Sequence, residues 1–596
     1  MISIKNFAQD EFPRWAEGVV WYQIFPERFA NGDPTNDPTA DKVFAGRKTI
    51  PKDWKVTKWT SHWFAQAKWE KEMDGRFRNH IYERRYGGDI QGIINRLDYL
   101  KGLGVGAIYL NPMFEANSLH KYDGSTYHHI DVNFGPDPER DKKIIASENP
   151  DDPSSWKWTS ADSLFLELIK QVHKRGMHII IDGVFNHTGV NFWAFKDIVK
   201  NQQNSKYKDW YIIKSFDNPK TPKNEFDYKG WAGIKHLPEF NRSKYDLNPG
   251  PKQYIFNATK RWMDPNNDGD PSDGIDGWRL DVAGEVPIGF WKDWSALVKS
   301  INPHAFIAGE LWHLSPEFIQ KNGPFNSLMN YPFAVAVKNL FIDKKNEITV
   351  SKFIDELKKI DAAYPEENLN ILMNLMDSHD TDRLSSMIKN PDRDYDTHDD
   401  AKNWDYDPGK PDKADYEMQK LIAAFQITYR GAPMIYYGDE VGMWGADDPH
   451  DRKPMLWGNL KYDDEIITAA SGFHKGFGRY KVGVNKDLLN FYKKIISIRN
   501  ENLSLQRGDL KFLYSNDKIK SFVFKRSFKG DEMIIGFNLG QKTDSVNIPI
   551  QGEKVSYSGL LTNEQGNASS TGNSSAQIMI NLPPQSFRIY KIYNLK

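Results

Sequence analysis

The chain has 596 residues, with 79 Lys or Arg against 80 Asp or Glu, so its net charge is -1. That length predicts one large domain and at least one smaller one, while the even charge disfavours nucleic acid and anionic membrane surfaces as partners. The chain contains no cysteine, which excludes disulfides, thiolate metal sites and a cysteine nucleophile. The sequence contains no run of about 18 apolar residues, so it predicts no membrane-spanning helix.

The first residues, MISIKNFAQDEFPRW, lack the basic and apolar regions of a signal peptide. We therefore expect a cytoplasmic protein, or a secreted or periplasmic one if a signal peptide has been removed from the sequence. A cysteine-free chain tolerates an oxidising or a reducing compartment, so composition does not choose between these locations.

Apolar runs typical of buried strands alternate with amphipathic helical segments along most of the chain. This βα alternation predicts a parallel sheet, and eight such units predict a (β/α)8 TIM barrel in an α/β fold. The clearest helical segments are 89–104, 160–176 and 286–300. The eight predicted strands are 19–25, 105–112, 177–187, 277–282, 304–311, 325–332, 369–379 and 432–440.

Three connections are too long for ordinary loops, and such connections are usually functional or independently folded. We expect the second of them, which follows the third strand, to form an inserted subdomain. The three are 113–159, 188–250 and the Asp-rich stretch 389–417. From about residue 505 the sequence changes to short alternating apolar runs, which predict a small all-β domain. The predicted division is a catalytic barrel over 1–504 and a C-terminal β-sandwich over 505–596.

Four predicted strands end in acids with polar neighbours. In a TIM barrel, chemistry takes place at the C-terminal ends of the strands. A single acid there is usually a cap or a salt bridge, but four at one rim would repel each other strongly, so together they predict a functional site. The four groups are Asp182 with Asn186 and His187, Arg279 with Asp281, Glu310, and His379 with Asp380.

Two carboxyl groups in different protonation states are what glycoside hydrolysis requires. Arg279 lies two residues from Asp281 on the same strand face, so it is expected to favour the ionised form, and Asp281 is the predicted nucleophile. The residues after Glu310 are apolar, which is expected to favour its protonated form and suits it to acid and base work. We expect His379 and Asp380 to bind sugar hydroxyls and to stabilise the oxocarbenium-like transition state.

The same four segments, in this order on an eight-fold βα pattern, closely resemble the four short motifs of the α-amylase family, glycoside hydrolase family 13. They are DGVFNH (182–187), GWRLD (277–281), GELW (309–312) and SHD (378–380). The resemblance covers nearly the whole chain. It implies that Asp281 is the nucleophile, Glu310 the acid/base and Asp380 the transition-state stabiliser. The residues that it implies around the cleaved sugar are Arg279, His187 and His379.

Further segments resemble the neopullulanase, cyclomaltodextrinase and maltogenic amylase branch of that family. They are HKYD (120–123), LDVAGEV (280–286), MNYPF (329–333) and GDEVGMWGADDPHDRKPM (438–455). The resemblance implies that Tyr122 is a stacking platform under the cleaved glucose, with His120 beside it. For Tyr122 and Trp312 the alternative is core packing. The other implied contacts are Asp448 and Arg452 on the non-reducing side, and Glu285 and Trp312 on the leaving side.

Members of that branch commonly carry an N-terminal β domain, which helps to form a dimer and narrows the active site. Here the first barrel strand is expected near residue 19, so we expect that domain to be absent, which would be a departure from the branch. A preference for cyclodextrins and dimerisation are therefore left open, and we expect a monomer or a weak homodimer.

Two loops are rich in oxygen donors without His or Cys, which suits a hard cation and points to Ca²⁺ as the cofactor. The first site combines FANGDPTND (29–37) with YGGD (86–89), and both segments resemble the calcium loop of the neopullulanase branch. The alternative is an Asx-rich turn. The predicted ligands are Asn31, Asp33, Asn36, Asp37, the carbonyl of Gly87, and Asp89.

The second candidate calcium loop is DPNNDGDPSD (264–273), in which Asp264, Asn266 and Asp268 follow the opening spacing of an EF-hand loop. Ile275 stands where the bidentate Glu of that loop belongs. Asp270 or Asp273 can substitute for it, and the alternative is a solvated acidic loop. In either case we expect a structural role.

The sequence predicts a retaining hydrolase of α-1,4-glucosidic bonds in starch and maltodextrins, with pullulan and cyclodextrins as further candidates. A sugar acceptor in place of water would give transglycosylation, so a 4-α-glucanotransferase is the alternative. A non-catalytic glucan-binding subunit is a remote alternative, because such a protein is expected to lack one of the three carboxylates. The expected partners are α-glucan oligosaccharides or polysaccharides.

Overall fold

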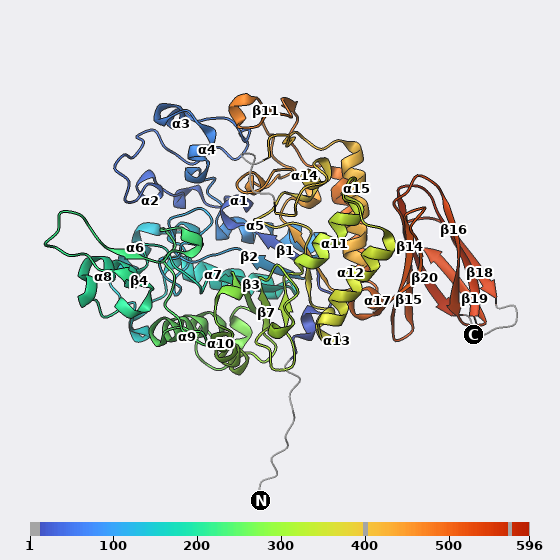
Figure 1. Cartoon of the computed structure of the whole chain (residues 1–596), viewed down its shortest axis with the longest axis horizontal. Coiled ribbons are helices and arrows are strands. Elements are labelled where there is room, and N and C mark those ends of the chain that lie inside the picture. Colours follow the sequence, from blue (N-terminus) through green and yellow to red (C-terminus); the bar gives the residue numbers. More distant parts are fainter. Residues whose placement is uncertain (1–11, 397–402, 570–574, 595–596) are drawn as a thin grey trace, which may run out of the picture.

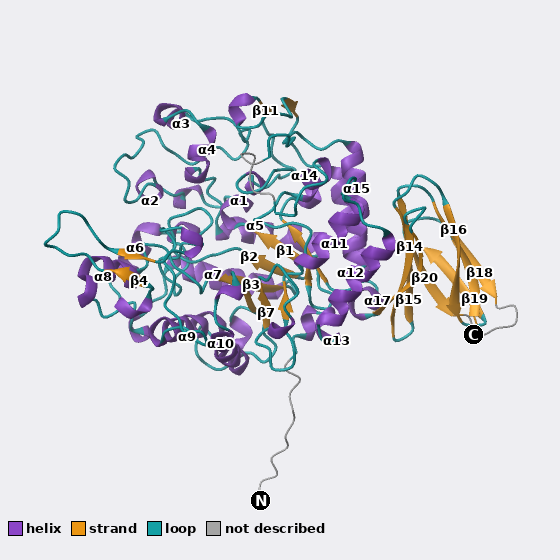
Figure 2. Ribbon diagram, viewed as in Figure 1, coloured by secondary structure: helices purple, strands orange, loops and turns teal. Residues whose placement is uncertain are grey.

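The computed structural model describes residues 12–396, 403–569 and 575–594. A large α/β part carries a smaller all-β part at one side, formed by the C-terminal end of the chain (Figure 1). Figure 2 shows a central group of strands surrounded by helices, and a second group of strands in the C-terminal part. No helix among the described residues is both long and apolar enough to cross a membrane.

Eight parallel strands form a nearly closed barrel, in the order β8-β7-β6-β3-β2-β1-β10-β9. A parallel bridge between Met329 and Met373 joins the two ends of that order. The predicted TIM barrel is therefore confirmed, with strands shorter than predicted. The strands are β1 (Trp21–Ile24), β2 (Ala107–Leu110), β3 (His178–Gly183), β6 (Gly277–Leu280), β7 (Phe306–Gly309), β8 (Ser327–Leu328), β9 (Met373–Asn374) and β10 (Ala432–Tyr436).

Period-two alternation along these strands separates two hydrophobic layers. In β2, Ala107 and Tyr109 belong to the cluster that fills the barrel, together with Trp21 and Met434. Their neighbours, such as Ile108, belong to the cluster between the barrel and the helices. Because successive side chains of a strand point to opposite faces, a strand buried on both faces reads as a continuous apolar run.

Helices surround the barrel (Figure 2), and the three predicted from the sequence are present as α5, α7 and α10. The helices of six residues or more are α3 (Lys68–Met73), α5 (Ile90–Leu103), α6 (Pro138–Ala146), α7 (Ser160–Lys174), α8 (Trp193–Asn201), α9 (Pro249–Met263), α10 (Ile288–Ile301), α11 (Tyr331–Phe341), α12 (Val350–Ala363), α14 (Leu384–Lys389), α15 (Lys413–Thr428) and α16 (Lys486–Asn500). The shorter ones are α1 (Pro26–Phe29), α2 (Ala40–Val43), α4 (Phe77–His80), α13 (Glu366–Leu369) and α17 (Leu503–Arg507).

Long connections cover one end of the barrel. The stretch 188–250 holds α8 and a small hairpin of β4 (Ile213–Ser215) and β5 (Asp227–Tyr228). A further long connection, residues 25–89 between β1 and α5, was not singled out in the sequence. Its Trp63 and Phe77 pack with Phe473, which follows a second hairpin strand, β11 (Glu465–Ile467), paired with β12 (Gly478–Tyr480).

The C-terminal part consists of two packed antiparallel sheets, as predicted. One sheet has the order β13-β14-β15-β20-β17-β18, and the other pairs β16 with β19. Apolar residues of both sheets, among them Val523, Ile548 and Ile580, form the core between them. The strands are β13 (Asp509–Asn516), β14 (Ser521–Phe528), β15 (Asp531–Asn538), β16 (Asp544–Gln551), β17 (Lys554–Gly559), β18 (Gln565–Ser569), β19 (Ser575–Leu582) and β20 (Ser586–Asn594).

Candidate active site

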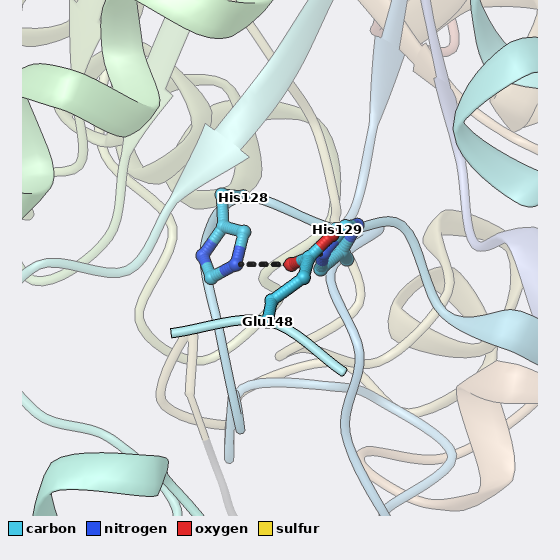
Figure 3. A group of neighbouring side chains, drawn as sticks. All are labelled: His128, His129 and Glu148. Carbon is cyan, nitrogen blue, oxygen red and sulfur yellow. Dashed lines mark hydrogen bonds and ion pairs between the residues drawn. The ribbon is translucent and has the colours of Figure 1, made fainter. Parts of the chain in front are cut away.

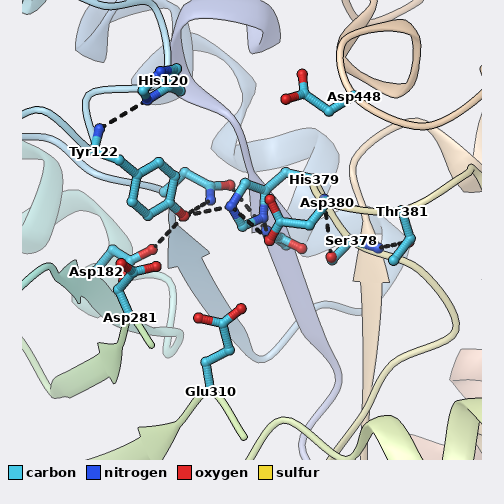
Figure 4. A network of polar contacts seen from close by, with 12 residues as sticks. His120, Tyr122, Asp182, Asp281, Glu310, Ser378, His379, Asp380, Thr381 and Asp448 are labelled. Carbon is cyan, nitrogen blue, oxygen red and sulfur yellow. Dashed lines mark hydrogen bonds and ion pairs between the residues drawn. The ribbon is translucent and has the colours of Figure 1, made fainter. Parts of the chain in front are cut away.

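The predicted acids meet at the C-terminal ends of the barrel strands, beside a cavity of about 730 Å³. That size falls within the usual range of ligand sites, about 300–1,000 Å³. Figure 4 shows the carboxyl groups of Asp281, Glu310 and Asp380 facing a common space, with the Tyr122 ring at another side of it. The predicted residues that line the cavity are His120, Tyr122, His187, Asp281, Glu310, Trp312, His379, Asp380, Asp448 and Arg452.

Arg279 joins three of the acids beneath the cavity. Its side chain is fully buried in β6, and its Nη1 lies 2.9 Å from Asp182 Oδ1 and 2.9 Å from Asp281 Oδ1. Its Nη2 lies 3.0 Å from Glu310 Oε2. Asp182 also accepts a hydrogen bond from Tyr109 at 2.8 Å. One guanidinium therefore holds the predicted nucleophile and the predicted acid/base in fixed positions, as its rigid fork of donors permits.

The pKa of Asp281 is shifted in the opposite direction to the one predicted from the sequence. Burial raises the pKa of Asp281 well above its usual range, Arg279 lowers it, and the carboxyls of Glu310 and Asp182 raise it further. Arg279 acts in the predicted direction, but the net shift is upward, because a buried carboxylate loses its hydration and lies close to two other acids. Burial thus favours the protonated form of Asp281, while its pairing with Arg279 favours the ionised form that can attack a sugar.

Polar donors, rather than an apolar neighbourhood, hold Glu310 directly after β7. Its Oε2 accepts the backbone N–H of Val282 at 2.8 Å, and its Oε1 accepts the indole N–H of Trp312 at 3.2 Å. The Trp312 ring stacks on Tyr331 with ring centroids 4.0 Å apart. Trp312 lines the cavity and is partly exposed, so it is not a core residue only.

Tyr122 is fixed by a network that reaches back into the barrel (Figure 4). Its hydroxyl donates to Asp182 Oδ2 at 2.9 Å, accepts from Asn111 Nδ2 at 3.0 Å and contacts His379 Nε2. Gln23 Nε2 donates to His379 Nδ1 at 2.9 Å, so the proton of that ring belongs on Nε2. Burial lowers the pKa of His379 well below its usual range, which makes it a neutral donor.

His120 and His187 are neutral as well, because burial lowers the pKa of each ring to about 3. His120 Nδ1 accepts the backbone N–H of Tyr122 at 3.1 Å, which orients the turn that carries Tyr122. His187 Nε2 is buried and has no hydrogen-bond partner among the described residues. The Trp231 ring stacks on His187 with centroids 5.2 Å apart.

Arg452 ties Asp380 to Asp448. Its Nη2 lies 3.2 Å from Asp380 Oδ1, its Nη1 lies 2.9 Å from Asp448 Oδ1, and its Nε donates to the carbonyl of His379 at 2.7 Å. Burial raises the pKa of Asp380 to about 7, although Arg452 lowers it. The pair predicted to clamp the non-reducing side therefore also positions the predicted transition-state stabiliser.

Two predicted sugar contacts do not line the cavity: Arg279, which is fully buried beneath it, and Glu285. The Glu285 side chain is exposed, and it is not among the described residues that line the cavity. Its backbone carbonyl accepts a hydrogen bond from Arg242 at 2.6 Å. The leaving-side role of Glu285 stays a prediction.

The structure adds to the cavity Val282, directly after Asp281, and six other residues that were not predicted from the sequence. Trp231, Ile234 and Leu237 come from the inserted stretch 188–250, and Tyr82 comes from the connection 25–89. Aromatic residues in long connections, such as Trp231 and Tyr82, are a signal for sugar-binding residues that the sequence does contain. The sequence does not show which of these side chains turn toward the cleft. The remaining two are Asp396 and Asp447.

The first predicted calcium loop has the chemistry of a cation site. Asn31 Oδ1 and Asn36 Oδ1 are buried and accept no hydrogen bond among the described residues. Asn31 Nδ2 donates to Asp37 Oδ1 at 2.8 Å, and burial raises the pKa of Asp37 to about 6. A Cβ atom at Gly87 would lie 2.0 Å from Asp37 Oδ1, so this backbone segment lies against the loop.

Asp89 and Asp33 have structural partners in the same loop. Asp89 caps α5 by accepting the N–H of Gly92 at 2.6 Å and also accepts the backbone N–H groups of Gly32 and Asp33. Asp33 accepts the N–H of Thr35 at 3.0 Å. The side-chain oxygens of Asn31 and Asn36, together with the Asp37 carboxyl, are therefore the oxygens available to bind a cation.

The second predicted calcium loop is exposed and bonds largely to itself. Asp264 accepts the N–H groups of Asp268 and Gly269, at 3.2 and 3.0 Å. Asn266 Nδ2 donates to Asp268 Oδ2 at 3.0 Å. This pattern is that of an Asx-rich turn, so calcium binding there stays a prediction.

Known proteins resemble this chain in both sequence and fold. The sequence matches the family Alpha-amylase (Alpha amylase, catalytic domain) over residues 23–147 and 160–508. It is 33% identical over 555 residues to Neopullulanase 2 of Thermoactinomyces vulgaris, covering 93% of this chain and 75% of that protein. It is 30% identical over 580 residues to a cyclomaltodextrinase of Geobacillus thermopakistaniensis, covering 97% of this chain and 78% of that protein.

A solved structure of a cyclomaltodextrinase matches with a TM-score of 0.68 at 30% identity, covering 98% of this chain and 79% of that chain. The four motifs that suggested the family lie around one cavity at the end of the barrel where TIM-barrel enzymes place their active sites. The chain belongs to the α-amylase family, glycoside hydrolase family 13, and is a hydrolase whose homologues act on glucans.

Proposed function

We propose that this enzyme hydrolyses α-1,4-glucosidic bonds of starch-type glucans and maltodextrins with retention of the anomeric configuration. The observation that carries the proposal is the position of Arg279, which hydrogen-bonds Asp281 at 2.9 Å and forms an ion pair with Glu310 at 3.0 Å. Two carboxyl groups on one guanidinium lie close together, and retaining glycosidases place theirs about 5–5.5 Å apart. A wider pair, with room for a water molecule, would favour inversion.

In the first proposed step, Glu310 gives its proton to the glycosidic oxygen while Asp281 attacks the anomeric carbon. The bond to the leaving sugar breaks, and a covalent β-glucosyl ester of Asp281 remains. In the second step, the Glu310 carboxylate takes a proton from water, whose oxygen attacks the same carbon and releases Asp281. Two inversions restore the α configuration.

The other residues of the cleft bind and orient the sugar. Tyr122 offers a ring face beside His379, with which it stacks at a centroid distance of 5.4 Å. His379 Nε2 lies 3.2 Å from Asp380 Oδ2, which places the Asp380 carboxyl beside the ring and toward the space for sugar hydroxyls. Preorganised groups of this kind favour a transition state in which positive charge develops on the sugar.

Pullulan and cyclodextrins are proposed as further substrates on the names of the relatives, which are called neopullulanase and cyclomaltodextrinase. Transglycosylation is the alternative reaction, in which a sugar hydroxyl replaces water in the second step. Trp312 beside Glu310 and Trp231 beside His187 support it, since both aromatic rings line the cleft where an acceptor sugar would stack.

Ca²⁺ is proposed as a structural cation at the first loop, held by Asn31, Asn36 and Asp37 with the Gly87 carbonyl. Oxygen ligands of this kind suit a hard cation. Bound there, it would neutralise Asp37 and fix the loop before α5. Calcium content measured on the washed protein tests this, with Asn31→Leu expected to lose the ion and Asn95→Leu, on the exposed face of α5, expected to keep it.

The reaction is tested first with Asp281→Asn, which should lower turnover of maltoheptaose by on the order of 10⁴-fold because no nucleophile remains. Glucan binding should persist, since Tyr122 and the other side chains that line the cavity are unchanged. Early products of the unaltered enzyme should be α anomers by proton NMR, whereas β anomers would exclude retention. Unchanged turnover in Asp281→Asn would exclude the mechanism.

Substrate choice is tested by incubating the enzyme separately with soluble starch, pullulan and β-cyclodextrin and resolving the products by size. Products from all three substrates would support the wider range. Products longer than the starting maltooligosaccharide would favour the transferase. Products from starch alone would restrict the enzyme to plain α-amylase activity.

A further inference from the structure

A second cluster of polar side chains lies outside the cleft, in the connection between β2 and α7. One ring nitrogen each from His128 and His129 and one carboxylate oxygen of Glu148 all lie within 4.8 Å of one another. Glu148 Oε2 lies 2.8 Å from His129 Nε2 and 3.5 Å from His128 Nε2, and Figure 3 shows the side chains facing each other. The exposed fraction of each of the three side chains is 2% or less.

The far atoms of the same three side chains are held by an outer ring of partners. His129 Nδ1 lies 2.8 Å from Asp162 Oδ2. His128 Nδ1 lies 2.7 Å from the hydroxyl of Tyr254. Glu148 Oε1 accepts the backbone N–H of Lys157. In protein metal sites, outer partners of this kind fix the orientation of each ligand and the tautomer of each histidine.

The hydrogen bonds around Tyr254 are compatible with the tautomer of His128 that leaves Nε2 free to bind a metal ion. The Tyr254 hydroxyl accepts the backbone N–H of Tyr127 at 3.0 Å and lies 2.9 Å from Thr126 Oγ1, to which it can donate. His128 Nδ1 lies 2.7 Å from this hydroxyl and 2.7 Å from Thr126 Oγ1, and in the metal-bound form its N–H donates to one of these two oxygens. That leaves a lone pair on His128 Nε2, which faces the carboxylate of Glu148. Two electron-rich atoms that face each other in a buried site are stabilised by a cation between them.

The charges around the cluster can also accommodate a cation. A metal ion binds neutral histidines, so in the metal-bound form the ionisable groups are the carboxylates of Glu148 and Asp162 and the guanidinium of Arg261, which lies 3.2 Å from Asp162 Oδ2. Their formal sum is one negative charge. The ring of Trp156 stacks on His128 with centroids 4.0 Å apart and covers the cluster.

We propose that His128 Nε2, His129 Nε2 and Glu148 Oε2 bind one divalent transition-metal ion, for which Zn²⁺ is the best match. Two imidazoles and one carboxylate are a known zinc ligand set, with bonds of about 2.0–2.2 Å. Tetrahedral bonds of that length place two ligand atoms roughly 3.4 Å apart. The distance of 3.5 Å between Glu148 Oε2 and His128 Nε2 is close to that value, and the distance of 2.8 Å between Glu148 Oε2 and His129 Nε2 is shorter. Water can supply the fourth ligand. This site differs from the predicted calcium loops, which contain only oxygen donors.

A bound ion would join two parts of the segment between β2 and α7, which also carries Tyr122 of the cleft. His128 and His129 follow the turn that holds Tyr122, while Glu148 lies in the loop after α6. Tyr127 joins the same segment to the barrel side, since its hydroxyl donates to the carbonyl of His187 at 2.8 Å. The expected role is therefore structural support of the cleft wall.

Metal uptake by the whole enzyme is the first test. Protein freed of metal with a chelator is dialysed, loaded with Zn²⁺ or Co²⁺, passed through a desalting column and analysed by mass spectrometry for metals. We expect one Zn²⁺ per chain, retained in excess Ca²⁺, and a Co²⁺ form with the visible absorption of a site of low coordination number. A wild-type enzyme that retains no Zn²⁺ would overturn the proposal.

A matched pair of variants locates the ion. Glu148→Gln removes one ligand and should weaken Zn²⁺ binding at least about 100-fold, as loss of a ligand or its support does in metal sites. Asp276→Asn is the control, because Asp276 also joins two histidines, His173 and His178, but through a different oxygen to each. That variant should bind Zn²⁺ like the wild type.

The thermal unfolding midpoint supplies a second readout. Added Zn²⁺ should raise the midpoint of the wild type and of Asp276→Asn, because a ligand that binds only the folded chain stabilises it. It should leave Glu148→Gln unchanged. If Glu148→Gln does not fold, His128→Gln takes its place in both measurements. Equal Zn²⁺ uptake by the wild type and either ligand variant would place the ion elsewhere and overturn the proposal.

Discussion

Two buried arginines organise the charges of the cleft at the scale of single residues. Arg279 lies between Asp182, Asp281 and Glu310, and Arg452 lies between Asp380 and Asp448. A buried charge is tolerated only when it is paired and hydrogen-bonded, and each guanidinium meets that condition. The carboxyl groups are consequently held in place before any sugar binds.

The pH dependence should follow from Asp380, whose pKa burial raises to about 7 while Arg452 lowers it. As the pH falls through about 7, Asp380 takes up a proton and kcat/KM should fall. In Arg452→Gln the opposing cation is gone, so this pKa rises further and the fall should move to higher pH by at least about half a unit.

The measurement is kcat/KM on maltoheptaose from about pH 5 to about pH 9. Arg588→Gln, in the C-terminal β domain, is the control and should leave the profile in place. An acidic limb at the same pH in Arg452→Gln and in the wild type would contradict the role given to Asp380.

At the scale of elements, the barrel and its cover differ in how well the sequence predicts them. The strands β2 and β3 are short apolar runs between turn residues, and local pattern is enough to find them. The connections 25–89 and 188–250 contain mostly short helices and two-residue pairings, whose positions depend on contacts far along the chain. The local sequence pattern therefore did not predict that the connection 25–89 forms part of the cleft.

The inserted stretch 188–250 should contribute to substrate affinity through Trp231, which stacks on His187 and lines the cavity. Trp231→Ala should raise KM for maltoheptaose roughly 3- to 10-fold, since an aromatic contact contributes about 0.5–1.5 kcal/mol. A small change in kcat is expected, because the carboxyl groups are untouched.

The control for Trp231 is Tyr245→Ala in the same stretch, whose side chain is 72% exposed and which does not line the cavity among the described residues. It should leave KM unchanged. Equal KM values for Trp231→Ala and the wild type, measured on maltoheptaose, would remove Trp231 from the proposed subsites.

At the scale of the whole molecule, the barrel and the C-terminal β domain share an aromatic interface. Phe522 of β14 lies 5.9 Å, between ring centroids, from Phe425 of α15 and 5.8 Å from Phe353 of α12. Phe537 of β15 lies 5.7 Å from Phe425. These rings are fully buried, so the two parts do not present separate surfaces at this place.

We expect the barrel and the β domain to unfold in one transition because of this interface. Phe522→Ala should lower the free energy of unfolding by about 3–5 kcal/mol, the usual cost of removing a buried phenylalanine ring. Scanning calorimetry measures it. Met579→Ala is the control, since Met579 is 66% exposed on β19 and should change little.

Two separate heat-capacity peaks in the wild type would contradict a shared transition. A Phe522→Ala variant as stable as Met579→Ala would show that the interface contributes little. Either result would also allow the β domain to be removed without loss of the barrel.

The sequence by itself determined the eight-fold βα pattern, the family and the identity of most residues at the cleft. These follow from local order: an acid such as Asp281 comes directly after its strand, and parallel strands end at one rim whatever the remaining chain does. The C-terminal sheets were likewise readable from alternation along each strand, as in the burial pattern of β16.

Only the tertiary structure decided the direction of the pKa shift of Asp281, the polar surroundings of Glu310, the exposed position of Glu285 and the meeting of His128, His129 and Glu148. Burial and distance between residues far apart in the chain govern each of these features. A pKa depends on how much water a group loses and which charges surround it in space. Sequence spacing cannot supply those quantities, because they arise when separate elements pack together.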